Sequence, residues 1–126
     1  MEGITIFQEQ SFVEQLKQRL RLVLDWKVEE EKENGQVDLI VEDPQSGKRM
    51  FIEFKQAGRY GQLPVSTVLS MNKQKNRLSA KDILCLVSFS DIPGMLDDKL
   101  KELGIMTIEK PSVEDAAGKI ERVMRT

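Results

Sequence analysis

Three charged residues on two neighbouring predicted strands have types and spacing that could carry chemistry. Asp38 interrupts the apolar run of residues 37–41. Glu53 and Lys55 stand in the second run, residues 50–55, which is otherwise apolar. Because side chains alternate along a strand, Glu53 and Lys55 project to the same face. The apolar residues that alternate with the charged residues along these strands are expected to face the core.

The turn that joins the two runs determines which residues face each other. It contains Asp, Pro, Ser and Gly, which favour turns. If the turn is centred on Gln45 and Ser46, Asp38 lies directly opposite Glu53 on an antiparallel hairpin. Lys55 then lies on the face that both carboxylates share. The sequence therefore predicts two carboxylates and one ammonium group at one site.

Two like charges opposite each other destabilise a sheet unless something compensates for them. A divalent cation would do so, since Mg²⁺ prefers carboxylate oxygens and keeps several waters, one of which can be activated for attack on phosphorus. We predict Asp38 and Glu53 as ligands of Mg²⁺ or Mn²⁺. Lys55 would orient the water or offset charge that develops on the phosphate. The alternative is an exposed hairpin with a cross-strand ion pair.

Two further carboxylates could join this site. A two-residue turn at Asn34-Gly35 would place Glu31 opposite Asp38. Glu14 could be a ligand from the first helix. It also fits a capping box that starts at Ser11, and we favour the cap.

Composition excludes several other chemistries. The 126 residues contain no histidine, which removes His-dependent nucleophiles and His-ligated metal sites. The single cysteine, Cys85, lies in an apolar run and is expected in the core of a protein from a reducing compartment. No apolar stretch is long enough for a membrane span, and the first residues do not resemble a signal peptide. We therefore expect a cytoplasmic protein that forms a single domain over residues 1–126.

Periodicity predicts four helices and five strands. Helices are expected over residues 11–24, from Pro64 to Leu78, from Pro93 to Gly104 and from Ser112 onward. Strands are expected over residues 26–33, 37–41, 50–55, 81–89 and 105–108. The order α-β-β-β-α-β-α-β-α predicts a three-layer α/β sandwich with a mixed central sheet. In the last helix an apolar stripe should pack on the sheet; if exposed, it would indicate a homodimer.

At Asp38 and at Glu53-Phe54-Lys55 the sequence resembles the PD-(D/E)XK, or restriction-endonuclease-like, phosphodiesterase superfamily. The element order of residues 11–89 is similar to the core of this superfamily, and the small size is most like archaeal Holliday-junction resolvases. Val37 stands where the Pro of the motif name would be. The resemblance implies a Mg²⁺-dependent endonuclease that hydrolyses DNA, with Asp38, Glu53 and Lys55 as its catalytic residues. It leaves open a non-catalytic member that binds nucleic acid or a protein partner.

The charge distribution adds a candidate DNA-binding segment. The net charge is −2, yet the segment from Phe54 to Lys81, with both ends included, contains six basic residues and no Asp or Glu. Phosphate contacts supply sequence-independent affinity for DNA. We predict such contacts from Arg59, in the loop after the motif, and from Lys73, Lys75 and Arg77. A solvated helix face is the alternative for the last three.

Overall fold

A computed structural model describes residues 6–31, 38–56 and 61–126. Its elements follow the predicted order. They are α1 (Ile6–Leu22), β1 (Lys27–Glu30), β2 (Leu39–Glu42), β3 (Arg49–Lys55), α2 (Ser66–Lys75), β4 (Ile83–Ser88), α3 (Gly94–Glu102), β5 (Met106–Glu109) and α4 (Val113–Met124). The predicted Asn34-Gly35 turn lies outside the described residues.

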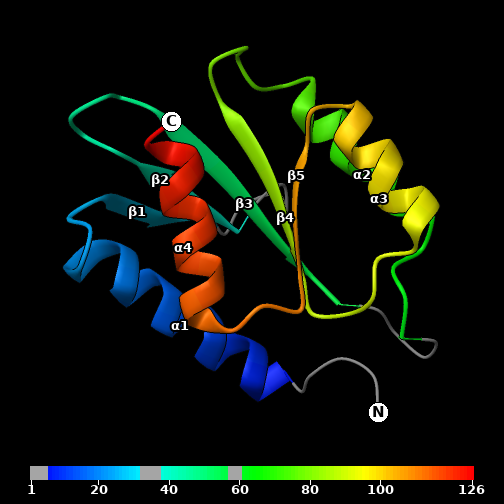
Figure 1. The fold of residues 1–126 in the computed structure, drawn as a ribbon, viewed down its shortest axis with the longest axis horizontal. Coiled ribbons are helices and arrows are strands. Elements are labelled where there is room, and N and C mark those ends of the chain that lie inside the picture. Colours follow the sequence, from blue (N-terminus) through cyan, green and yellow to red (C-terminus); the bar gives the residue numbers. More distant parts are fainter. Residues whose placement is uncertain (1–5, 32–37, 57–60) are drawn as a thin grey trace.

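The strands form one mixed sheet in the order β1-β2-β3-β4-β5 (Figure 1). The pairs β1·β2 and β2·β3 are antiparallel, whereas β3·β4 and β4·β5 are parallel. Parallel neighbours need a crossover connection, and α2 and α3 provide it. Each of these helices therefore begins near the carboxyl end of the strand that precedes it.

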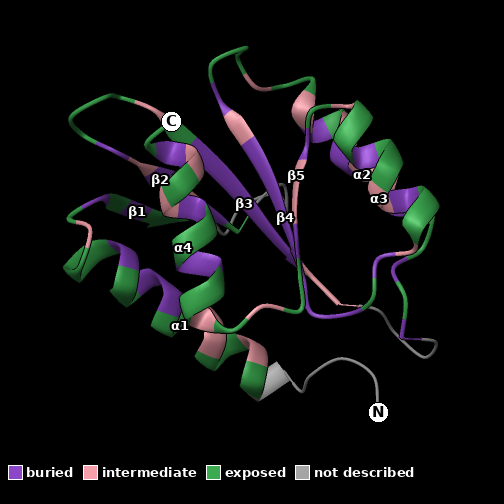
Figure 2. Ribbon diagram, in the orientation of Figure 1, coloured by how far each residue is buried: buried purple, intermediate pink, exposed green. Residues whose placement is uncertain are grey.

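Helices cover both faces of the sheet. Helices α1 and α4 lie on one face and α2 and α3 on the other (Figure 1). Figure 2 shows that β3 and β4, between the two layers, are buried along most of their length. The core beneath α1 and α4 includes Leu16, Leu20, Met50, Ile52 and Ile120. The core beneath α2 and α3 includes Phe51, Met71, Leu84, Leu86 and Leu100. The predicted three-layer sandwich is confirmed.

Helix α4 is the clearest example of sequence pattern determining packing. Ser112 precedes the helix, and its hydroxyl accepts a hydrogen bond from the Asp115 amide at 3.1 Å, as an N-cap should. Ala116 and Ile120 are buried in the core that α4 shares with α1. The predicted cap and stripe are both confirmed. Because the stripe is covered within the chain, it gives no indication of a homodimer.

We expect Ile120→Ala to be among the more destabilising core substitutions. Ile120 is 0% exposed, so the shortened side chain leaves a cavity between α4 and the sheet. The free energy of unfolding should fall by about 2–5 kcal/mol, measured by urea denaturation followed by circular dichroism. Ile120→Val, which removes one methylene, should cost only about 0.5–1.5 kcal/mol. Equal losses for the two variants would contradict this packing.

The start of α1 corrects one sequence prediction. The helix begins at Ile6, so Ser11 lies inside it rather than at its N-cap. The Ser11 hydroxyl accepts a hydrogen bond from the Gln15 side chain at 3.0 Å, and Glu14 forms an ion pair with Lys17 at 2.8 Å. The capping box is therefore wrong. Residues 8–10, Gln-Glu-Gln, are good helix formers and extend the helix past the Ser-x-x-Glu pattern.

Two other predictions concern burial and the membrane. Cys85 is fully buried, and burial raises the pKa of its thiol to about 12, so the thiol stays protonated. Trp26 is also a core residue.

Within the described ranges, no helix combines the length and apolar character that a membrane crossing requires.

Candidate functional site

The register of β2 and β3 agrees with the predicted hairpin. Leu39 pairs with Ile52 and Glu42 with Arg49. One step beyond the first pair, this register places Asp38 opposite Glu53. The β1·β2 register similarly leads to Glu31 opposite Asp38, and the Glu31 amide donates to the Asp38 carbonyl at 3.0 Å. The pairings inferred from the two turns are confirmed.

Asp38 lies just before β2 and contacts β3 through both its backbone and its side chain. Its amide donates to the Ile52 carbonyl at 2.8 Å, and its carboxylate accepts a hydrogen bond from the Phe54 amide at 2.7 Å. Burial raises the pKa of Asp38, the bond from Phe54 lowers it, the charge of Glu53 raises it and Lys55 lowers it; the net direction is upward. The carboxylate is thus fixed beside β3, close enough to Glu53 and Lys55 to sense their charges.

Glu53 is a buried carboxylate whose two oxygens both have partners. Its residue is 7% exposed and lies on the face of the sheet covered by α2. Lys55 Nζ lies 3.0 Å from Oε2, and Gln74 Nε2 donates to Oε1 at 2.8 Å. Charged side chains are rarely buried unless they are paired in this way. Lys55 and Gln74 therefore explain how β3 holds this carboxylate inside the fold.

Lys55 ends β3 at the edge of a groove. Its side chain is 30% exposed, so the ammonium group reaches solvent while it pairs with Glu53. The groove has a volume of about 360 Å³ and lies between the end of β3 and the start of α2. This position lets a phosphate group approach Lys55 from solvent.

Glu9 is a third carboxylate near the site that sequence analysis missed. It comes from α1, on the opposite layer, and accepts a hydrogen bond from Gln56 Nε2 at 3.1 Å. Burial raises the pKa of Glu9, and the charge of Asp38 raises it further, although the bond from Gln56 lowers it. An electrostatic interaction therefore links α1 to the site. Glu14, the α1 carboxylate that the sequence offered as a possible metal ligand, instead pairs with Lys17.

Gln74 was also missed. It lies on the buried side of α2 together with Thr67 and Met71, at positions i, i+4 and i+7 of the helix. Its Oε1 is buried and has no hydrogen-bond partner among the described residues. A glutamine in an apolar helical stripe was the sequence signal that could have identified it, because such a polar group needs a buried partner.

The predicted basic segment diverges from the site along α2. Arg59 lies outside the described residues. Gln74 contacts Glu53, and Ser70, one turn earlier, lines the groove with Lys55, so α2 runs antiparallel to β3. Lys75 and Arg77 follow Gln74 and hence lie toward the start of β3. Lys73 and Arg77 are exposed and form no ion pair within the described ranges, which leaves their DNA contacts as a prediction.

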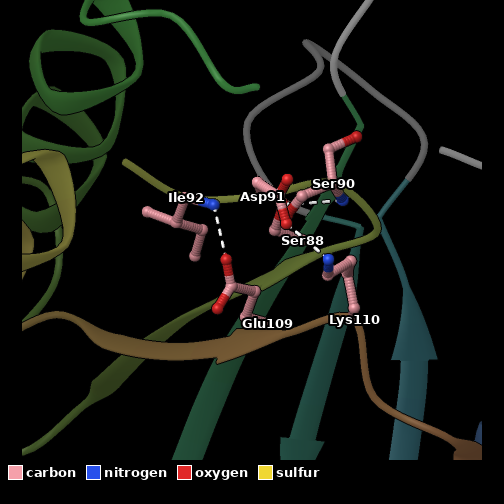
Figure 3. Close-up of polar contacts among 6 residues, drawn as sticks. All are labelled: Ser88, Ser90, Asp91, Ile92, Glu109 and Lys110. Atoms are coloured by element: carbon pink, nitrogen blue, oxygen red, sulfur yellow. Dashed lines mark hydrogen bonds and ion pairs between the residues drawn. The ribbon is translucent and has the colours of Figure 1, made fainter. Parts of the chain in front are cut away.

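The carboxyl ends of β4 and β5 form a polar corner at the same end of the sheet (Figure 3). The buried Ser88 hydroxyl donates to the Ser90 carbonyl at 2.6 Å and accepts from the Ser90 amide at 3.1 Å. Lys110 Nζ pairs with the Asp91 carboxylate, and Glu109 accepts from the Ile92 amide at 2.6 Å. These contacts fix the turn that follows β4.

This corner also holds the chain that returns from the site to α2. The Asp91 amide donates to the Gly61 carbonyl at 3.2 Å, and the Leu63 amide donates to the Asp91 carbonyl at 3.1 Å. Lys55 is paired with Ser88 in the sheet. The β4 turn therefore supports both β3 and the approach to α2, and we assign it a structural role.

The carboxylates of the site do not form a complete metal cage. Among described residues, no three His, Cys, Asp or Glu side chains form a group that could hold a metal ion. Mg²⁺, however, is commonly held by one or two carboxylates together with waters and substrate phosphates. Asp38 and Glu53 fit that donor set in kind, because both are carboxylates and the β2·β3 register leads to Asp38 opposite Glu53. Their role as ligands remains a prediction.

Comparisons with known proteins identify the fold. No known family matches the sequence, and no characterised protein matches it significantly. In structure, the chain is similar to protein VC1899 from Vibrio cholerae, with a TM-score of 0.62 and 17% identity. It is also similar to a repair endonuclease from Pyrococcus abyssi (TM-score 0.53, 21% identity) and to the MspJI restriction endonuclease in complex with a 27-mer oligonucleotide (TM-score 0.52, 9% identity).

These similarities cover 91%, 81% and 92% of this chain, which spans 32%, 47% and 30% of the three longer chains. The chain has a restriction-endonuclease-like fold, as its motif and element order predict. The more specific resemblance to small Holliday-junction resolvases remains a prediction.

Proposed function

We propose that the protein is a Mg²⁺-dependent endonuclease that hydrolyses DNA phosphodiester bonds. The observation that carries this proposal is the convergence of Asp38, Glu53 and Lys55 at one end of β3 within a nuclease-like fold. Asp38 and Glu53 would hold the cation, Mg²⁺ or Mn²⁺. When bound, the cation supplies neutralisation of phosphoryl charge and activation of a water molecule.

The residues of the chain have distinct roles in this proposal. The bond from Phe54 fixes the orientation of the Asp38 carboxylate, and the bond from Gln74 fixes that of Glu53. Both side chains are therefore oriented before any ligand binds, which lowers the entropy lost on binding. Lys55 places a positive charge at the groove, where it would stabilise negative charge that develops on the phosphate.

The second candidate is a non-catalytic member of the fold that binds nucleic acid or a protein partner. One specific observation favours it: protein groups already satisfy both oxygens of Glu53. A cation at Oε2 would have to displace Lys55. If that displacement is too unfavourable, Lys55 and Glu53 form a structural ion pair, and the site has no catalytic activity.

Metal titration and cleavage assays distinguish the two candidates. Calorimetry with Mg²⁺ or Mn²⁺, with and without DNA, measures whether the protein binds the ion. Duplex, branched and single-stranded DNA are then incubated with the protein and either ion. The enzyme proposal expects metal binding and cleavage of at least one substrate. No cleavage with retained DNA binding would support the binding module.

The basic segment leads to a prediction about affinity rather than chemistry. Replacing Lys73, Lys75 and Arg77 together by Gln should weaken DNA binding and flatten its salt dependence. Each lost phosphate contact should reduce the slope of log K against log salt by about 0.9. Fluorescence anisotropy at several salt concentrations measures this slope. Lys119→Gln, an exposed lysine on α4, is the control. Unchanged affinity in the triple variant would place the DNA elsewhere.

A further inference from the structure

Three large apolar side chains at the starts of α2 and α3 are left uncovered by the fold. Val65 is 79% exposed, Leu69 is 73% exposed and Met95 is 88% exposed. Val65 and Leu69 lie one turn apart at the start of α2, and Met95 lies in the first turn of α3. Exposed apolar side chains that gather in one patch commonly mark a surface that contacts another protein.

The arrangement of α2 and α3 brings these three side chains together. The two helices contact each other side by side (Figure 1). Gln62 and Asp91 form a parallel β-bridge just before the helices begin. At the other end of α2, the Lys75 side chain lies against Gly104, just after α3. The helices therefore run in the same direction with their starts adjacent, and the three side chains form one surface, which we call the apolar patch.

Beyond the apolar patch, the two helices carry opposite charges on their outer faces. On α2, Lys73 lies one turn beyond Leu69. On α3, Asp98 and Glu102 lie three and seven residues beyond Met95, on the same face. The three charged residues are exposed, and their side chains form no hydrogen bond or ion pair within the described ranges.

The other cations of α3 do not cancel its two carboxylates. Lys101 is already paired with Asp97 at 2.8 Å. Lys99 follows the buried Leu96 by three residues, which places it on the flank next to the buried stripe of the helix. The outer surface thus combines an apolar patch, a cation on α2 and two carboxylates on α3. Such a surface is complementary to a copy of itself.

We propose that the outer faces of α2 and α3 bind the same faces of a second copy of this chain, in a two-fold symmetric dimer. A two-fold axis parallel to the helices places α2 of each copy over α3 of the other, because the helices lie side by side and run in the same direction. Lys73 lies seven residues after the first residue of α2, and Glu102 lies eight residues after the first residue of α3, so the two are level. Each Lys73 then faces Glu102 of the partner subunit, and the apolar patches meet at the helix starts.

The apolar patch and the charges have different roles in this interface. Burial of the apolar side chains supplies the free energy of association. The opposite charges determine which helix lies over which, because the wrong alignment would bring like charges together. Lys73 is also one of the basic residues predicted to contact DNA, so the dimer is tested with DNA absent.

Sedimentation velocity over a concentration series from about 1 μM to about 1 mM measures dimer formation. We expect the wild type to form a dimer within this range. Leu69→Ser and Met95→Ser should each raise the dissociation constant by about tenfold or more, because each removes apolar area twice per dimer. Leu22→Ser is the matched control, since this leucine is 81% exposed on α1, outside the apolar patch. The control should leave the constant unchanged.

A charge-exchange experiment tests the pairing itself. Lys73→Glu makes carboxylates face each other at two places in the dimer, and Glu102→Lys makes cations do so. Each variant alone should therefore dimerise about tenfold more weakly than the wild type. In a mixture of the two variants, the heterodimer has opposite charges at both places and should form with nearly the wild-type affinity. Charges that interact only within one molecule cannot produce this recovery on mixing.

Circular dichroism and thermal unfolding verify that each variant is folded, and Lys119→Glu on α4 controls for the change in net charge. A wild-type chain that stays monomeric throughout the series would overturn the proposal. So would a mixture that dimerises no better than its two components, or a dimer that all of these substitutions leave unchanged, because its interface would then lie elsewhere. Metal binding and cleavage are measured separately, so failure of the dimer leaves the nuclease proposal standing.

Discussion

Asp38→Asn and Glu53→Gln are each expected to reduce metal-dependent DNA cleavage to background while leaving the protein folded. Both substitutions keep the shape of the side chain and remove the charge that attracts a divalent cation. An Asn at position 38 can still accept from the Phe54 amide through its carbonyl oxygen, and a Gln at position 53 can still accept from Gln74. The hydrogen bonds from Phe54 and Gln74 therefore survive, whereas Glu53→Gln gives up the ion pair with Lys55. The loss of cleavage should still follow from the loss of the metal.

Three measurements test this prediction together: cleavage of a labelled DNA substrate, calorimetric titration with Mn²⁺, and thermal unfolding. Glu14→Gln is the matched control, because it removes a carboxylate from α1 that pairs with Lys17 rather than with the site. The control should cleave DNA at the wild-type rate. A variant of Asp38 or Glu53 that unfolds near the wild-type temperature and still cleaves would show that the metal ligands lie elsewhere.

The hairpin that carries these two residues could be predicted because its turn is local. Once Asp43 is placed opposite Lys48, period-two alternation determines every other pair, including Asp38 with Glu53. In the structure the Asp43 amide donates to the Lys48 carbonyl at 3.0 Å, which agrees with this predicted pairing. The helix at Ser112 was predictable for the same reason, since its cap and its stripe are both encoded within a few residues.

The missed residues depend on contacts between distant parts of the chain. Glu9 meets Gln56 across 47 positions, and Gln74 meets Glu53 across 21. No local pattern identifies either partner, although the position of Gln74 in the buried stripe of α2 indicates that it needs one. The capping box at Ser11 failed for a related reason: a four-residue pattern competes with the helix propensity of the residues before it, and here the propensity prevails.

The basic segment shows a limit of counting charges along a sequence. The six basic residues from Phe54 to Lys81 predict a single DNA-binding segment. The structure instead divides the segment between the site and the far end of α2, because α2 runs antiparallel to β3 and its last basic residues follow Gln74 away from Lys55. Direction along the helix, rather than net charge, decides which cations lie near the candidate metal ligands.

Lys55→Met is expected to separate metal binding from turnover. Methionine keeps an unbranched side chain in the groove but removes the ammonium group that pairs with Glu53 Oε2 at 3.0 Å. Mn²⁺ then no longer competes with Lys55 for this oxygen, so the affinity for Mn²⁺ should be retained or should increase. The rate of cleavage should fall by about 10²–10³-fold, the typical cost of removing one preorganised group that stabilises transition-state charge. The same contrast does not arise for Asp38 or Glu53, because those variants should lose the metal itself.

Single-turnover cleavage at saturating Mn²⁺ measures the chemical step, and calorimetry measures the affinity for the ion. Lys101→Met is the matched control, since that lysine pairs with Asp97 on α3, outside the site. It should change neither quantity. If Lys55→Met instead lost metal binding and kept its single-turnover rate at high Mn²⁺, Lys55 would act by holding Glu53 in place. If cleavage and affinity were both unchanged, Lys55 would have no part in the reaction, and the ion pair with Glu53 would be a structural feature of β3. A selective loss of the chemical step is the outcome that requires a cation directed at the reacting phosphate, because in that case the ammonium group interacts with the transition state more strongly than with the ground state.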